Sequence, residues 1–304
     1  MDRRPAPGRP RGRPRQAPRR GLAALRPLAA RHGLSLPPPR RAGQADVSDA
    51  HARRVQAQFG PSAAAYVAST SHAGGDDLER LLAWVRACRP GRALDVATGG
   101  GHTALALAGV AREVVAFDVT EPMLRAAREF IRSRGAANVR FAAGDVEALP
   151  FRDGAFDAVT CRIAAHHFAN VAAAIRQVHR MLRPGGSFLV QDILGHDDPA
   201  ANAFITEVER RRDPSHVRAY RGSEWKAFLR AAGLTVIDEG VVRKIRPWDE
   251  WTGRTRMTPE ALHALEAFVR QAPERCRAAF DFELAGDRIA SFTDRMILLR
   301  ADRD

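Results

Sequence analysis

Short apolar runs alternate with amphipathic stretches through most of the chain after about residue 46. Apolar runs of strand length predict five strands, at residues 92–96, 113–118, 139–142, 157–161 and 187–192. Stretches with helical spacing lie around them, at residues 77–88, 103–108, 121–134, 172–182 and 223–232. This alternation is typical of an α/β domain with a mostly parallel sheet.

Two further strands are expected near the end of the chain, at residues 234–238 and 290–300. The segment between them holds Trp248, Trp251 and a helix that starts at Thr258. We expect residues from about 200 to 285 to include elements that cover a substrate.

The stretch from Ala93 to Ala104 reads Ala-Leu-Asp-Val-Ala-Thr-Gly-Gly-Gly-His-Thr-Ala. Leu94 and Val96 suit a buried strand, the glycines permit a tight turn that a ligand can approach, and the residues from Thr103 favour a helix. The pattern predicts a strand, loop and helix that bind a nucleoside cofactor.

Two cofactor classes compete for this loop. Gly99, Gly101 and Ala104 satisfy the dinucleotide fingerprint, and the acidic Asp118 follows about 20 residues on. Against a dinucleotide stands Asp95, since a carboxylate at the end of the strand repels phosphates. S-adenosylmethionine has no phosphate and carries an amino group and a sulfonium, so the charge of this loop favours it.

Residues 1–45 differ in composition from the rest of the chain. Residues 1–50 hold twelve arginines against three aspartates, a net charge of +9 out of the formal +13 of the whole chain. Rich in Arg, Pro and Gly, residues 1–45 predict a disordered basic extension, with a folded domain over 46–304. The remaining chain is nearly balanced in charge, so we expect no specific nucleic-acid partner, although the extension could adhere to polyanions.

Cysteine spacing and apolar run length limit the other classes of protein. Cys88, Cys161 and Cys276 lie far apart without metal-ligand spacing, so we expect no metal site and no disulfide framework. No run of 18 apolar residues occurs, so we expect no membrane span and a cytoplasmic protein. The sequence leaves the oligomeric state open.

With these segments placed, the chain resembles the class I S-adenosylmethionine-dependent methyltransferases, and within them the ubiquinone/menaquinone-biosynthesis-type group (methyltransferase type 11-like). The ordered motifs that carry the resemblance lie at 94–101, 115–118, 144–151, 156–159 and 180–186. The resemblance implies a doubly wound, mostly parallel, seven-stranded sheet of Rossmann-like type whose last strand, 290–300, is reversed. It also implies methyl transfer to a carbon, oxygen or nitrogen of a small-molecule acceptor. A nicotinamide-dependent oxidoreductase is the alternative.

The resemblance implies roles for the acids at the strand ends. Asp95 would orient the loop and the methionine amine, Asp118 would accept from the ribose hydroxyls, and Asp145 would accept from the adenine amino group, beside the Val146 backbone. Met123 would pack on the adenine. Capping or turn roles remain alternatives for the three acids, as core packing does for Met123. The full expected cofactor set is Asp95, Ala97, Gly99, Gly101, Asp118, Val119, Met123, Asp145, Val146 and Arg162.

The chain after the fourth predicted strand holds His166 and His167, which the family topology would place beside the sulfonium methyl. Either histidine could remove a proton from the acceptor near neutral pH, or could be a packed or capping residue. His216 and Arg218 are expected to contact the acceptor, with a solvated charged loop as the alternative reading.

Overall fold

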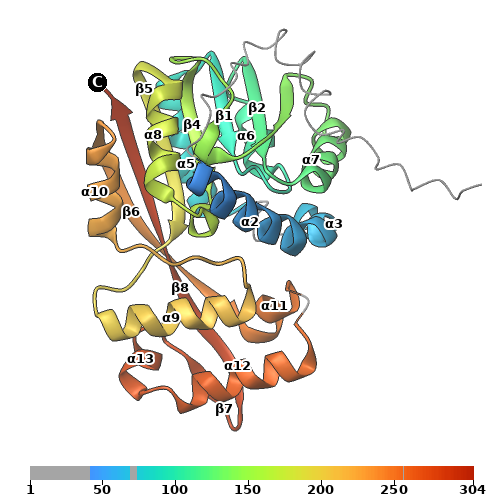
Figure 1. The fold of residues 1–304 in the computed structure, drawn as a ribbon, viewed down its shortest axis with the longest axis vertical. Coiled ribbons are helices and arrows are strands. Elements are labelled where there is room, and N and C mark those ends of the chain that lie inside the picture. Colours follow the sequence, from blue (N-terminus) through green and yellow to red (C-terminus); the bar gives the residue numbers. More distant parts are fainter. Residues whose placement is uncertain (1–41, 69–73, 256) are drawn as a thin grey trace, which may run out of the picture. The chain divides into compact units, whose positions relative to one another are not determined.

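In the computed structural model, the described residues are 42–68, 74–255 and 257–304. They form one mixed sheet in the order β3-β2-β1-β4-β5-β8-β6, with β7 paired to β8 (Figure 1). The strands are β1 Arg92–Val96, β2 Glu113–Asp118, β3 Val139–Ala143, β4 Phe156–Arg162, β5 Leu182–Ile193, β6 Leu234–Pro247, β7 Glu283–Ala285 and β8 Arg288–Arg303.

The predicted doubly wound fold is confirmed. Strands β1 to β5 are parallel, and β8 runs antiparallel to β5, with Ser187 opposite Asp302. The path of seven strands matches the expectation, and β7 adds an eighth, a three-residue strand that pairs with the start of β8. All three residues of β7 are exposed, so no apolar pattern marked it in the sequence.

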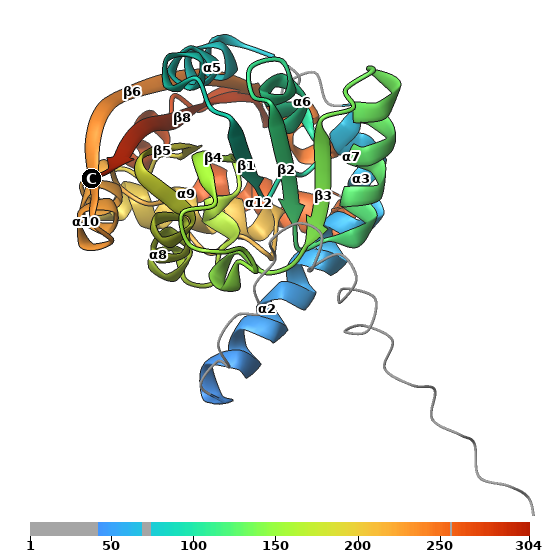
Figure 2. The same cartoon turned by 90° about the horizontal axis from the view of Figure 1, so that it is seen from above.

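Helices cover both faces of the sheet (Figure 2). Apolar side chains of α5 Asp76–Cys88, α6 His102–Ala108 and α7 Glu121–Ser133 share one core with β1, β2 and β4. On the other face lie α8 Val171–Met181 and α10 Gly222–Ala231. The buried positions of α8, Ala174, Ile175 and Val178, recur at helical spacing, which is why this segment forms a helix with one apolar face.

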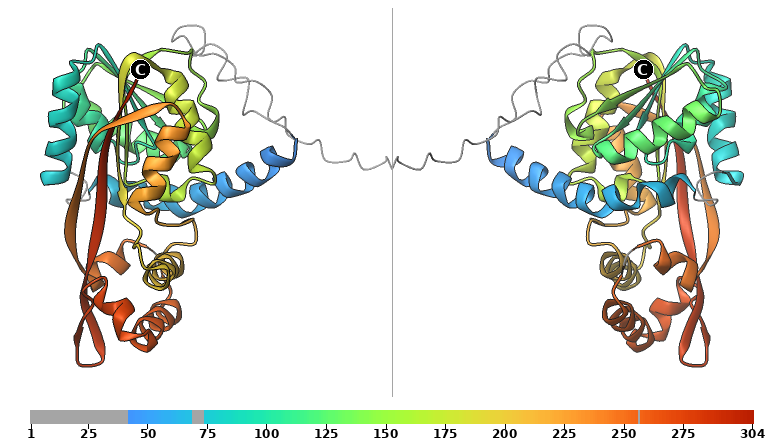
Figure 3. Two further views of the ribbon diagram at one scale, coloured as in Figure 1. Left: turned by 90° about the vertical axis from the view of Figure 1, so that its left-hand side faces the viewer. Right: turned by 90° about the vertical axis from the view of Figure 1, so that its right-hand side faces the viewer.

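A second apolar core lies where β6 and β8 extend beyond the parallel strands (Figure 3). Helices α9 Pro199–Arg212, α11 Trp248–Gly253, α12 Pro259–Gln271 and α13 Glu274–Ala278 pack there around Trp248, Phe280 and Phe292. The expectation of a strand over 234–238 was too short, because β6 continues to Pro247 through exposed positions such as Ile245. We call helices α9, α11, α12 and α13 together with strand β7 the cover.

The chain enters the fold through α2 Ala42–Phe59, η1 Gly60–Ser62 and α3 Ala63–Val67. Helix α2 begins at Ala42, within the last four residues of the extension expected over 1–45. The rest of that extension lies outside the described residues. Within the described part of the chain, no helix has both the length and the apolar character needed to cross a bilayer.

Asp77 connects α5 to three strands through a buried ionic network. Its carboxylate receives Arg162 Nη2 at 2.9 Å, Gln191 Nε2 at 2.7 Å and Lys244 Nζ at 2.7 Å. Burial acts to raise the pKa of Asp77, but Arg162, Lys244 and Gln191 outweigh it and lower that pKa to about 2. The network therefore holds the ends of β4, β5 and β6 against the first turn of α5.

Because the pKa of Asp77 is lower in the folded chain, its ionised form stabilises the fold above about pH 4, and this contribution is lost as the pH falls toward 2. We expect Asp77→Asn to lower the free energy of unfolding by about 3 kcal/mol at pH 7, because Arg162 and Lys244 lose a buried partner. The variant should also lose about 2 kcal/mol of the acid dependence below pH 4. Urea unfolding at several pH values measures both.

The matched control is Asp153→Asn, whose carboxylate pairs with Arg180 but is 76% exposed. We expect this change to lower the free energy of unfolding by less than about 1 kcal/mol. Equal effects of the two variants would contradict the proposed importance of the buried network.

Candidate active site

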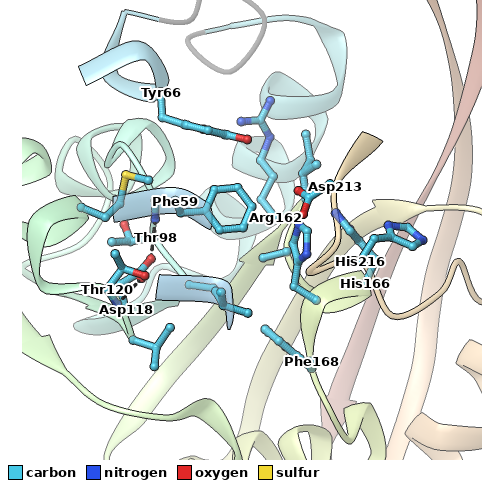
Figure 4. A pocket seen from close by; sticks show the side chains of 18 of the residues that line it. Phe59, Tyr66, Thr98, Asp118, Thr120, Arg162, His166, Phe168, Asp213 and His216 are labelled. Atoms are coloured by element: carbon cyan, nitrogen blue, oxygen red, sulfur yellow. Dashed lines mark hydrogen bonds between the residues drawn. The ribbon is translucent and has the colours of Figure 1, made fainter. Parts of the chain in front are cut away.

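A pocket opens at the carboxyl ends of the parallel strands, where the sequence placed the cofactor loop (Figure 4). Its walls come from the segments after β1, β2, β3 and β4, from α2 and α3, and from the cover. The expected cofactor residues that line it are Ala97, Gly99, Asp118, Val119, Met123, Asp145, Val146 and Arg162. Asp95 and Gly101 are not among its lining residues.

Asp95 fixes the glycine loop through buried hydrogen bonds. Its carboxylate accepts from the Thr98 hydroxyl at 2.6 Å and from the Thr160 hydroxyl at 2.7 Å, and the residue is 1% exposed. Burial raises the pKa of Asp95 to about 6, against the opposing effect of both hydroxyls. This placement fits a loop-orienting role, while contact with the methionine amine stays a prediction.

The loop backbone has the left-handed conformation at three of its expected positions. Ala97 has φ +52°, Gly99 has φ +53° and Gly101 has φ +86°. A Cβ on Gly101 would lie 2.9 Å from Ile131 Cδ1 and 3.0 Å from Ala127 Cβ, so this glycine lets α6 start close against α7. Gly101 therefore contributes packing behind the loop, and Ala97 carries a strained backbone at the pocket wall.

Asp118 joins the loop after β1 to the end of β2. Its carboxylate accepts from the Gly99 amide at 2.9 Å and from the Thr120 amide at 2.8 Å (Figure 4). Burial raises the pKa of Asp118, and the backbone amides of Thr120 and Gly99 oppose that rise. The carboxylate lines the pocket, so the same group that fixes the loop is within the cavity wall.

The segment after β3 forms another part of the wall. The Asp145 carboxylate accepts from the Glu147 amide at 2.8 Å and caps η2 Val146–Ala148. Val146 and Met123 are buried apolar residues that line the same cavity. Val119 lines it too, and its carbonyl accepts from Gln56 Nε2 of α2 at 2.8 Å. This end of the pocket is mostly apolar with a carboxylate at its edge.

At the other end of the pocket lies η3 Ala165–His167, which carries both predicted catalytic histidines. His166 Nδ1 is 2.5 Å from Asp192 Oδ1, and the His166 amide donates to Asp192 Oδ2 at 2.9 Å. Burial disfavours the imidazolium, but the Asp192 charge and hydrogen bond outweigh it and raise the pKa of His166. A carboxylate thus orients this ring and strengthens it as a base.

His167 lies beside His166 in a different electrostatic environment. Its Nδ1 is 3.1 Å from Ser215 Oγ, which donates to Asp213 at 2.6 Å. Burial and the charge of His166 lower the pKa of His167 to about 3, so this ring stays neutral at physiological pH. Phe59 packs edge-on against it, with ring centroids 5.0 Å apart.

His216, one of the two expected acceptor contacts, also lines the pocket (Figure 4). Its ring centroid lies 5.1 Å from that of His166, and the residue is 4% exposed. Burial, followed by the charge of His166, strongly lowers the pKa of His216. Among the described residues neither ring nitrogen of His216 has a hydrogen-bond partner.

Arg218, the other expected acceptor contact, does not line the pocket. Its guanidinium pairs with Glu224 of α10 and lies 4.8 Å from the centroid of the Tyr220 ring. A local carboxylate and ring thus hold the Arg218 guanidinium outside the cavity wall, unlike His216. Arg162 does line the cavity, although its Nε donates to Gln191 and its Nη2 to Asp77.

Several lining residues were not singled out in the sequence. Two ion pairs line the cavity, Arg212 with Glu209 at 3.3 Å on α9 and Arg246 with Asp294 at 3.0 Å between β6 and β8. No local motif marks these residues, because only the folded chain brings them to the cavity. Such residues add hydrogen-bonding groups to the end of the pocket that holds the histidines.

Comparison with known proteins agrees with this arrangement. A family model described as a methyltransferase domain matches residues 94–190. The uncharacterized methyltransferase YcgJ of Bacillus subtilis is 35% identical over 222 residues, which cover 73% of this chain and 88% of the relative. The demethylmenaquinone methyltransferase of Thermus thermophilus is 47% identical over 117 residues, which cover 38% of this chain and 51% of that protein.

Solved structures show the same likeness over the folded part of the chain. A Bacillus halodurans protein assigned as a methyltransferase aligns with a TM-score of 0.73 at 37% identity, covering 75% of this chain and 99% of that one. The structure of YcgJ aligns with a TM-score of 0.71 at 33% identity, covering 74% of this chain and 98% of that one.

In the described part of this chain, no group of three or more His, Cys, Asp or Glu residues is arranged to hold a metal ion.

The left-handed backbone at Ala97 generates a prediction. Glycine adopts φ +52° without the Cβ strain that alanine carries, a difference of about 1 kcal/mol before the greater freedom of glycine in the unfolded chain is counted. We expect Ala97→Gly to leave the melting temperature unchanged or raise it by a few degrees. The matched control, Ala126→Gly within α7, should lower stability by about 1 kcal/mol. Equal losses in both variants would contradict the strain at Ala97.

Proposed function

The chain belongs to the class I S-adenosylmethionine-dependent methyltransferases, and from that premise we propose how its pocket divides between cofactor and acceptor. The cofactor binds at the ends of β1, β2 and β3, and a small-molecule acceptor binds between His166 and the cover. His166, oriented by Asp192, removes a proton from the acceptor. The observation that carries this proposal is that His166, hydrogen-bonded to Asp192, lines the same cavity as the glycine loop.

The residues present at the cofactor end suit a nucleoside without phosphates. The Asp118 and Asp145 carboxylates can accept hydrogen bonds from hydroxyl and amino groups, and Val146 and Met123 offer apolar contact to a flat base. When bound there, S-adenosylmethionine supplies an electrophilic methyl carbon on a sulfonium. Two carboxylates in this wall favour such a ligand over a pyrophosphate, which they would repel.

The acceptor end provides positioning and a proton acceptor. Displacement at a methyl carbon needs a nucleophile held in line at about 3 Å, so orientation and exclusion of water supply much of the rate. Phe59, Phe168 and Trp251 line this end and limit the water that reaches it. His166 Nε2 accepts the proton that the acceptor loses, and Asp192 stabilises the imidazolium that results.

The nicotinamide-dependent alternative is not supported. The relative YcgJ, whose match covers 73% of this chain and 88% of YcgJ itself, is named a methyltransferase. The matched family model is a methyltransferase domain. Gly99 and Gly101 satisfy the dinucleotide spacing, yet Asp95 places a buried carboxylate against the loop.

We expect Asp118→Asn to weaken binding of S-adenosylhomocysteine by about tenfold to a hundredfold, because a charged acceptor for ligand hydroxyls and for the Gly99 amide is lost. Isothermal titration calorimetry on the full chain measures this, with melting curves to establish folding. Arg218→Gln, whose side chain lies outside the pocket, is the control and should bind with unchanged affinity. A folded Asp118→Asn protein with normal affinity would overturn the assignment.

We expect His166→Gln to lower kcat by about 10²-fold to 10⁴-fold with little change in cofactor KM. In the unaltered chain, activity should rise with pH as His166 loses its proton, with a midpoint above the ordinary histidine pKa. Asp192→Asn should move that midpoint to lower pH, because the carboxylate that raises the pKa is gone. A profile from initial rates of methyl transfer that is flat from pH 5.5 to 9 would contradict His166 as the base.

A further inference from the structure

His166, His167 and His216 form an imidazole cluster at the acceptor end of the pocket, and Figure 4 shows His166 and His216. The ring centroids are 4.1 Å apart for His166 and His167, 5.1 Å for His166 and His216, and 6.2 Å for His167 and His216. At these separations one small group can reach more than one ring. The cluster therefore constrains which acceptors fit, and the protonation of each ring decides how.

The hydrogen bonds of Ser215 set the tautomer of His167. The Ser215 hydroxyl has a single proton, which it donates to the Asp213 carboxylate at 2.6 Å. His167 Nδ1, at 3.1 Å from Ser215 Oγ, must then donate, which leaves the lone pair on Nε2. In the same way Asp192 accepts a hydrogen bond from the Nδ1 proton of His166. The neutral form of His166 therefore has its lone pair on Nε2. Both rings consequently offer acceptor nitrogens to a ligand.

His216 is a buried polar side chain in the wall of the pocket. It is 4% exposed, and within the described ranges both of its nitrogens lack a hydrogen bond. An unsatisfied buried polar group destabilises the fold, so such a group in a cavity wall points to a ligand that satisfies it. A neutral imidazole both donates and accepts, which matches a hydroxyl.

The charges around the cluster favour a neutral ligand over an ammonium ion. His166 pairs with Asp192, Arg212 with Glu209, and Arg246 with Asp294. The carboxylate of each pair is already held by its own cation, so an ammonium ion would find no unpaired carboxylate among these three pairs and would have to be desolvated beside the sulfonium of the cofactor. A neutral hydroxylated acceptor meets the same groups without that penalty.

We propose that the acceptor is a neutral molecule with two hydroxyls on neighbouring carbons, of the catechol or enediol class, one held at His166 and the other at His216. This inference rests on the proposed function and specifies its substrate class. The first hydroxyl gives its proton to His166 Nε2 as its oxygen forms a bond to the methyl carbon. The carbon–sulfur bond breaks with its electron pair on sulfur, leaving a methyl ether, S-adenosylhomocysteine and an imidazolium that releases the proton to solvent.

The test compares three probes against the full chain saturated with S-adenosylhomocysteine: catechol, phenol and benzylamine. Calorimetry should give catechol an affinity at least tenfold above that of phenol, since the second hydroxyl adds hydrogen bonds to a group otherwise unsatisfied. Catechol with S-adenosylmethionine should also yield its mono-methyl ether. Equal affinity for catechol and phenol, tighter binding of benzylamine, or no catechol binding would each overturn the proposal.

Two variants separate recognition from structure. His216→Phe keeps a ring of similar size and removes both nitrogens, so it should abolish the preference for catechol over phenol while leaving phenol and S-adenosylhomocysteine affinities unchanged. A preference that survives in this variant would overturn the role of His216. If His216→Phe does not fold, His216→Leu, which also lacks a hydrogen-bonding group, serves instead. Arg218→Gln, outside the pocket, should retain the full preference. Failure of S-adenosylhomocysteine to bind the unaltered chain would refute the proposed function itself, before any probe is added.

Discussion

The buried carboxylate of Asp118 is the contact on which the site depends. It ends β2 and accepts the Gly99 amide of the loop that follows β1, so one side chain sets the distance between two neighbouring strand ends. Asp95 likewise fixes the loop relative to β4, because its carboxylate accepts from the Thr98 hydroxyl and from the Thr160 hydroxyl on β4. Both carboxylates are desolvated, which makes these hydrogen bonds strong and their loss costly. The geometry of the cofactor end is thereby fixed before any ligand arrives.

The acceptor end is built by longer-range packing. Strands β6 and β8 extend past the parallel sheet and carry a second apolar core, which positions the end of α9 over the strand ends. Through this arrangement His216 and Asp213 meet His166 and His167, which come from the segment after β4. Because the cover is separate from the strands that form the cofactor end, the same fold can serve acceptors of different chemistry across the family.

The neighbouring histidines, all of them buried, are driven to different protonation states by their surroundings. Asp192 contacts His166 directly and raises its pKa, whereas burial and the charge of His166 lower the pKa of His167. His216 is also buried, has no hydrogen-bond partner among the described residues, and has a lowered pKa. One ring with a raised pKa and two neutral rings follow from these surroundings, which no property of the isolated residues could distinguish.

Local pattern was enough to predict the strands that carry the proposed cofactor residues. Strands β1 and β2 lie at the predicted bounds, and Asp118, Asp145, Val146 and Met123 line the pocket, because parallel strands bring their carboxyl ends to one edge. What only the tertiary structure decided is which groups reach the acceptor. Arg218 is drawn away to Glu224, Asp95 faces Thr98 beneath the loop, and Arg212 and Arg246 enter the cavity from α9 and β6. Those contacts join residues distant in the chain, and their geometry arises from packing of the cover, which leaves no periodic signal in the sequence.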